Sequence, residues 1–145
     1  SLYELLLAFA LETQMTYSLS SKNRQASLEL SDNKRYELFV RKVAEEGEIW
    51  SLANEEGWVT VTGEDGENCL PVWPHPDYTL DWANGDWADC KPKMIDLATW
   101  LERWTPGLDQ DETLLVVLPN LKEEAVLVDP LVLDEDIRAA LEASE

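Results

Sequence analysis

Residues 48–73, EIWSLANEEGWVTVTGEDGENCLPVW, decide the fold class of this chain of 145 residues. Three short runs rich in β-branched and aromatic residues, a composition typical of β-strands, occupy 49–52, 58–62 and 69–73. Turn-forming residues separate these runs at 54–57 and 64–67, and Asp65-Gly66 is a strong hairpin signal. The stretch therefore predicts a three-stranded antiparallel meander over about 48–73.

The meander is bounded by a helix on one side and by prolines on the other. A helix is predicted over 33–46, because its apolar residues recur at the helical period: Tyr36, Phe39, Val40 and Val43. Gly47 follows as a C-terminal stop. Pro74 and Pro76 close the sheet, since proline has no N–H to donate to a neighbouring strand.

Further helices and strands are predicted outside this region. The expected helices are one at about 2–12, one at 21–30 opened by Ser20 or Ser21, one from Asp77 to a break at Asn84-Gly85, one opened by Asp96 and ended by Thr105-Pro106-Gly107, and one opened by Asp134. The expected strands cover about 113–118 and 125–128, joined by a turn at 120–124.

These elements predict one α+β domain with a mostly antiparallel sheet, the meander at about 48–73 plus strands at about 113–128, packed with several helices. The acidic α+β domain is expected over 15–145. An apolar helical extension over 1–14 precedes it, and Met15 is a candidate for the natural start. The leucine-rich segment at 2–11 is too short to span a bilayer and lacks the basic start of a signal peptide. Because an ordered apolar end must bury its leucines, a homodimer formed through this N-terminus is one expectation.

The net charge of −19 is unevenly distributed. Residues 1–42 carry a net charge of +1, and residues 43–145 carry −20. Such a surface repels nucleic-acid phosphates and anionic membranes, so neither is an expected partner. It attracts a basic protein and speeds encounter with one, although simple solubility explains the charge equally well. Two cysteines, Cys69 and Cys90, form no disulfide framework, and reduced thiols favour a cytoplasmic location.

The densest candidate binding site surrounds the segment Trp73-Pro74-His75-Pro76-Asp77-Tyr78. Flanking prolines restrict the backbone of His75, so its ring is held with little entropy left to lose. His75 could form a small polar site with Asp77, Asp81 or Tyr78, or it could simply cap the corner between strand and helix. Four further tryptophans lie nearby in the sequence. Trp82 and Trp87 flank a glycine bend and are the better candidates for exposure, whereas helical spacing favours a core position for Trp100 and Trp104.

No catalytic or metal motif accompanies this corner. Cys69, His75 and Cys90 lack the spacing of a zinc site, and the acidic turns lack the ligand pattern of a calcium loop. The sequence has no phosphate-binding glycine loop, nucleophile elbow or His-Glu-x-x-His motif. We therefore expect no cofactor, no bound metal and no catalytic residue.

The order of several motifs resembles a bacterial family catalogued as domain of unknown function 2750. The resemblance rests on 34–43 (KRYELFVRKV), 48–52 (EIWSL), Glu56-Gly57-Trp58, 70–76 and 104–108 (WTPGL), and extends over about 17–135. It implies a small cytoplasmic bacterial protein, and it transfers no catalytic residues to this chain.

Two functions follow as expectations. The first is a non-enzymatic interaction module whose acidic face binds a basic protein, for example as an antidote that covers the positive site of a nuclease toxin. The alternative is a small-molecule-binding protein or minor enzyme that uses the tryptophan-rich corner around His75, with Trp73, Asp77, Tyr78, Trp82 and Trp87.

Overall fold

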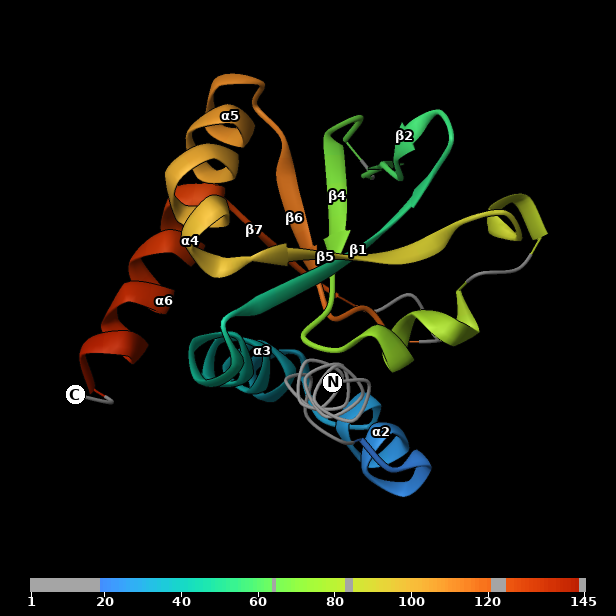
Figure 1. Ribbon diagram of the computed structural model, residues 1–145, viewed down its shortest axis with the longest axis horizontal. Coiled ribbons are helices and arrows are strands. Elements are labelled where there is room, and N and C mark those ends of the chain that lie inside the picture. Colours follow the sequence, from blue (N-terminus) through green and yellow to red (C-terminus); the bar gives the residue numbers. More distant parts are fainter. Residues whose placement is uncertain (1–18, 64, 83–84, 121–124, 144–145) are drawn as a thin grey trace, which may run out of the picture.

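The computed structural model describes residues 19–63, 65–82, 85–120 and 125–143. The predicted α+β class is confirmed: the described residues form two small sheets packed with helices (Figure 1). The predicted extension at 1–14 and its helix at 2–12 lie outside the described residues. Within them, no helix is both long and apolar enough to cross a bilayer.

The predicted three-stranded meander does not form as one sheet, because its middle strand is divided between the two sheets. Strand β1 (Glu48–Asn54) pairs antiparallel with β2 (Gly57–Trp58), and β3 (Val61–Thr62) pairs antiparallel with β4 (Asn68–Val72). β1 and β4 meet at an isolated bridge between Trp50 and Trp73, and diverge from it toward the turns (Figure 1). Because the outer strands diverge, one straight middle strand cannot pair with both.

The first sheet has the order β2-β1-β5, and its third strand was missed by the sequence analysis. Strand β5 (Lys91–Asp96) pairs with the whole of β1, from Glu48 opposite Asp96 to Ala53 opposite Lys91. Its sequence, KPKMID, contains a proline and two lysines, which are features of an edge strand rather than of a central one.

The second sheet has the order β3-β4-β6-β7 and contains the structure's one parallel pairing among the described strands. β6 (Leu114–Val117) runs parallel to β4 and antiparallel to β7 (Val126–Val128), so both predicted C-terminal strands are confirmed.

Capping residues correctly predict where the first described helix begins and where the second ends. Helix α2 (Ser21–Leu28) is capped by the Ser20 side chain, which accepts a hydrogen bond from the Asn23 N–H. Helix α3 (Asp32–Glu46) ends at Gly47, whose φ of 72° is the left-handed conformation that favours glycine.

Three other helix predictions need correction. The helix expected from Asp77 is replaced by two 3-10 helices, η1 (Pro76–Asp81) and η2 (Gly85–Trp87). The helix capped by Asp96 begins as predicted, but it does not end at Thr105-Pro106-Gly107. It continues from α4 (Leu97–Thr99) through a π-helical segment, η3 (Trp100–Trp104), into α5 (Thr105–Gln110).

The π-helical segment explains how the chain tolerates Pro106. The Thr105 N–H donates to the Trp100 carbonyl, five residues earlier, and this wider turn makes room for a proline ring that would break a regular helix. The last helix, α6 (Pro130–Ala143), begins four residues before the predicted Asp134, because the Asp129 side chain accepts the Leu131 N–H.

The core lies between the two sheets and helices α3 and α6. It is centred on fully buried residues from each element: Phe39, Ile49, Val72, Trp73, Trp100, Leu115 and Ile137. α6 packs against both α3 and α5 (Figure 1).

One charged side chain is buried beside this core. Arg35 of α3 is 1% exposed, and its guanidinium donates to the Leu118 carbonyl at 3.1 Å, to the Leu30 carbonyl and to the Asp32 carboxylate. These bonds join the α2–α3 turn to the end of β6. A buried charge is tolerated only where such bonds compensate its lost hydration.

We expect Arg35→Met to lower the free energy of unfolding by about 2–4 kcal/mol, because it leaves two backbone carbonyls without their donor. The exposed Arg41 on the same helix provides the matched control, and Arg41→Met should change stability by less than about 0.5 kcal/mol. Urea unfolding followed by tryptophan fluorescence measures both. Equal effects of the two substitutions would contradict the role assigned to Arg35.

Candidate functional site

The second sheet is apolar on both of its faces. Side chains alternate along a strand, so Leu70, Val72, Leu115 and Val117 point into the core. The intervening residues of the same strands lie on the outer face, where polar residues would be expected on a solvated sheet. They are nevertheless apolar: Cys69, Pro71, Val116 and, on β7, Leu127.

This outer face forms the floor of a groove with a volume of about 630 Å³, which we call the tryptophan groove. It is lined by Val61, Thr62, Gly63, Cys69, Pro71, Trp73, Trp82, Trp87, Val116, Pro119, Ala125 and Leu127. Trp82 links the tryptophans of its wall, with ring centroids 6.3 Å from Trp73 and 6.0 Å from Trp87. Trp73 is fully buried, and the other two are half-buried. Three of the six predicted binding residues therefore meet here.

The other three predicted residues lie at the beginning of the 3-10 helix η1 and do not line the groove. His75 is 5% exposed, and its Nδ1 accepts the Asp77 N–H at 3.1 Å, which caps η1. Arg24 of α2 donates to the Asp77 carbonyl at 3.1 Å. Tyr78 is buried, and burial raises the pKa of its phenol against opposing effects of Ser27 and Arg24. This is the capping role that the sequence left open for His75.

The two cysteines lie in different surroundings. Cys69 is part of the groove floor, whereas Cys90 contacts Asp89 and Asn54. Both are free and buried, and burial raises the pKa of each thiol, so both stay protonated at neutral pH. Within the described ranges, no three His, Cys, Asp or Glu residues are grouped so as to hold a metal ion.

Carboxylates gather on three turns and on the end of α5, at one end of the molecule. Because β4 and β6 are parallel, the turns that precede them lie side by side, and Asn68 donates to the Thr113 hydroxyl at 3.3 Å. The β1–β2 turn lies at the same, upper edge in Figure 1. We call this region the acidic end, and its residues are Glu55, Glu56, Asp65, Glu67, Asp109, Asp111 and Glu112.

An aromatic pair that the sequence analysis missed lies beside the acidic end. Trp58 of β2 is 37% exposed and meets Trp104 edge-on, with ring centroids 4.8 Å apart. Trp104 in turn stacks on the buried Trp100 at 5.5 Å. The core position predicted for Trp100 is confirmed, whereas Trp104 is half-buried and borders a small hollow of about 250 Å³ with Arg103 and Asp111.

Comparison with known families agrees with the resemblance seen in the sequence. Residues 36–137 match the family described as Protein of unknown function (DUF2750). The chain belongs to the DUF2750 family. A search of curated proteins found no match.

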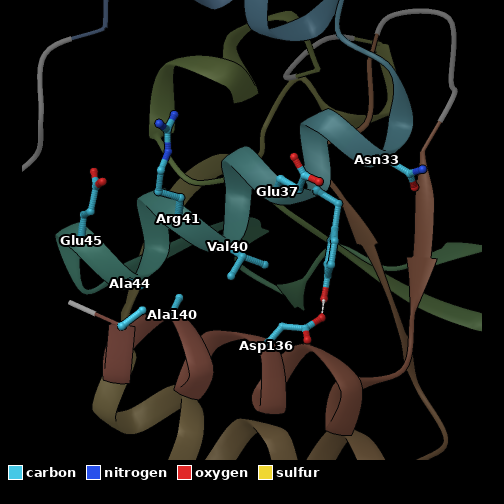
Figure 2. Close-up of a pocket in the computed structure, with 10 residues that line it drawn as sticks. Asn33, Glu37, Val40, Arg41, Ala44, Glu45, Asp136 and Ala140 are labelled. Atoms are coloured by element: carbon cyan, nitrogen blue, oxygen red, sulfur yellow. Dashed lines mark hydrogen bonds between the residues drawn. The ribbon is translucent and has the colours of Figure 1, made fainter. Parts of the chain in front are cut away.

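The two ends of the DUF2750 match lie together in the structure, between α3 and α6 (Figure 2). The Tyr36 hydroxyl donates to Asp136 at 2.5 Å, at one end of a hollow of about 640 Å³. Val40 points toward α6, and Ala140 points back toward α3, while Arg41 extends away from the hollow. Small and aliphatic side chains therefore line part of this hollow, and the Tyr36–Asp136 hydrogen bond lies at one end of it.

The Tyr36–Asp136 bond predicts an alkaline loss of stability in this DUF2750 protein. Burial, and then the hydrogen bond and charge of Asp136, raise the pKa of Tyr36 well above its ordinary value of 10. Because the pKa is higher in the folded than in the unfolded chain, the stabilisation is complete below about pH 10 and is lost as the pH rises further.

We expect Tyr36→Phe to lower the free energy of unfolding by about 1 kcal/mol at neutral pH, and to flatten its decline above about pH 10. Urea unfolding at a series of pH values measures both effects, and absorbance at 295 nm follows phenol ionisation directly. Parallel alkaline declines in wild type and variant would contradict the prediction.

Proposed function

We propose that this DUF2750 protein is a non-enzymatic interaction module that binds a basic protein through its acidic end. The proposal rests on the gathering of seven carboxylates on three turns and the end of α5, at one end of the molecule (Figure 1). The ion pairs found within the described part of the chain lie elsewhere. They join Arg35 to Asp32, Lys34 to Glu37, Lys42 to Glu45, His75 to Asp77 and Arg138 to Asp134.

Charge of one sign on neighbouring turns produces a potential that no single carboxylate could produce. It steers a basic partner into place, and raises the association rate more than the final affinity. The same potential repels nucleic-acid phosphates and anionic lipid headgroups, which makes a protein the favoured partner.

The Trp58–Trp104 pair can supply binding energy that long-range charge attraction does not. Interfaces draw most of their binding energy from a few aromatic and arginine residues in desolvated positions. Trp58 exposes part of its ring beside the carboxylates, so an arginine of the partner can stack on the indole while its neighbours pair with the acids. The partner we propose is therefore rich in arginine rather than only positively charged.

Further parts of the proposal rest on the sequence. Two free thiols favour the cytoplasm, and the resemblance implies a bacterial source. An antidote that covers the positive site of a nuclease toxin would have this charge and this absence of catalytic motifs. Homodimerisation through the apolar N-terminus is a separate proposal, because that segment lies outside the described residues.

The alternative, a small-molecule-binding protein or minor enzyme, is favoured by one observation, the tryptophan groove. For the binding part of this alternative, three of the predicted residues line the groove: Trp73, Trp82 and Trp87. The catalytic part of this alternative has less support, because His75 is 5% exposed and its Nδ1 accepts the Asp77 N–H that caps η1.

Two triple variants with equal net charge test the proposed function. The first, Glu55→Gln/Glu56→Gln/Asp111→Asn, neutralises three of the seven carboxylates of the acidic end. The second, Glu29→Gln/Glu135→Gln/Glu142→Gln, neutralises exposed acids outside it. Fluorescein-labelled octa-arginine and octa-lysine are the probes, and fluorescence anisotropy measures their binding.

We expect octa-arginine to bind more tightly than octa-lysine, and to lose about tenfold in affinity between about 50 and 200 mM NaCl. The first variant should weaken binding of octa-arginine about fivefold or more, and the second less than about twofold. Equal weakening by the two variants would show that only net charge matters, and would refute a specific acidic end.

A further inference from the structure

We propose that the tryptophan groove binds an uncharged, planar aromatic compound. This goes beyond the proposed function, because the groove uses side chains on the outer face of the second sheet, and none of the acidic end's carboxylates lines it.

The lining of the groove sets the charge of the ligand. None of the twelve lining residues is acidic or basic. The one titratable group among them is the Cys69 thiol, which burial and the charge of Glu67 keep protonated by raising its pKa. A charged ligand would lose hydration in the groove without gaining an ion pair from any of these described residues, which is unfavourable. The chain's charge of −19 disfavours an anion further.

The wall of the groove sets the shape of the ligand. The Trp82 ring is tilted by 49° against Trp73 and by 33° against Trp87, whereas the rings of Trp100 and Trp104 lie nearly parallel at 8°. Trp82 and Trp87 are only half-buried, so their rings keep part of their faces for another partner. A planar aromatic ring can stack on such a face, which adds to the energy of burying its area.

One wall residue carries a buried polar group without a hydrogen-bond partner. Among the described residues, the buried indole N–H groups of Trp50, Trp73 and Trp100 have no acceptor. Of these three, Trp73 alone lines the groove. A buried donor without a partner is costly, so an acceptor that reached it would be favourable.

The size of the groove is that of a small-molecule site. Its volume of about 630 Å³ lies in the range of pockets that hold drug-sized compounds. Its floor also leaves apolar side chains accessible, since Leu127 is 46% exposed. A compound seated on the floor would bury that surface.

The seven tryptophans provide a direct readout of binding. In full-length protein labelled with ¹⁵N-tryptophan, each indole N–H gives a separate NMR signal, which single Trp→Phe variants assign. Three probes share one ring and differ in charge: indole is neutral, indole-3-acetate is an anion and tryptamine is a cation.

We expect indole to shift the signals of Trp73, Trp82 and Trp87, with a dissociation constant of about 1 mM or lower. Indole-3-acetate should bind at least about tenfold more weakly, and tryptamine no more tightly than indole. The Trp58 and Trp104 signals should not move with indole.

Two leucines of nearly equal exposure give matched variants. Leu127, 46% exposed, lies on the groove floor, and Leu131, 48% exposed, lies on α6 outside the groove. We expect Leu127→Glu to weaken indole binding about tenfold and Leu131→Glu to leave it unchanged. Thermal unfolding confirms that both variants fold. If Leu127→Glu does not fold, Trp87→Ala, which removes part of the wall, provides a second test.

Three outcomes would overturn the proposal. One is the absence of shifts with indole, which would also result if residues 1–18 or a second copy of the chain occupied the groove. Another is shifts confined to Trp58 and Trp104. The third is equal binding by the two leucine variants. Octa-arginine distinguishes this proposal from the proposed function, since it should move Trp58 and Trp104 and leave the three groove signals in place.

Discussion

The fold depends on a buried guanidinium. Arg35 is hydrogen-bonded to the carbonyls of Leu30 and Leu118 and to Asp32, so it ties the turn between α2 and α3 to the end of β6. The chain takes an unusual conformation at this point, since φ of Leu118 is +45°. With that connection made, α3 lies against the core next to α6, and the N-terminal and C-terminal parts of the domain form one body. The charge can be buried because two carbonyl oxygens and one carboxylate oxygen replace the water that would hydrate it.

The parallel pairing of β4 with β6 creates both candidate surfaces. Parallel strands begin at the same end of a sheet, so the turns before β4 and β6 bring their carboxylates together at the acidic end. Strands in such a pairing are usually covered on both faces, and their sequences are accordingly apolar throughout, as Leu114–Val117 is. Helices cover one face of this sheet, whereas the other face forms the floor of the tryptophan groove.

The tryptophan-rich corner combines two kinds of side chain that serve different purposes. Trp73, Trp82 and Trp87 line the groove, whereas His75 caps η1 and Tyr78 interacts with Ser27 and Arg24 of α2. The prolines around His75 restrict its backbone for this structural purpose. The identity of His75 alone therefore does not indicate catalysis, because the accessible atoms and partners of a side chain decide what it can do.

The sequence by itself determined the α+β class, the net charge, the family and the elements whose signals are local. Ser20 and Gly47 delimit helices because capping depends on neighbours three or four residues away. It did not determine the division of the middle strand, the edge strand at 91–96, the continuation of the helix through Pro106, or which tryptophans share a groove. The tertiary structure decided these features, because each depends on partners distant in the chain. The segment KPKMID forms a strand by pairing with β1. Trp82 forms part of the groove wall because its ring lies next to that of Trp73, the residue that follows β4.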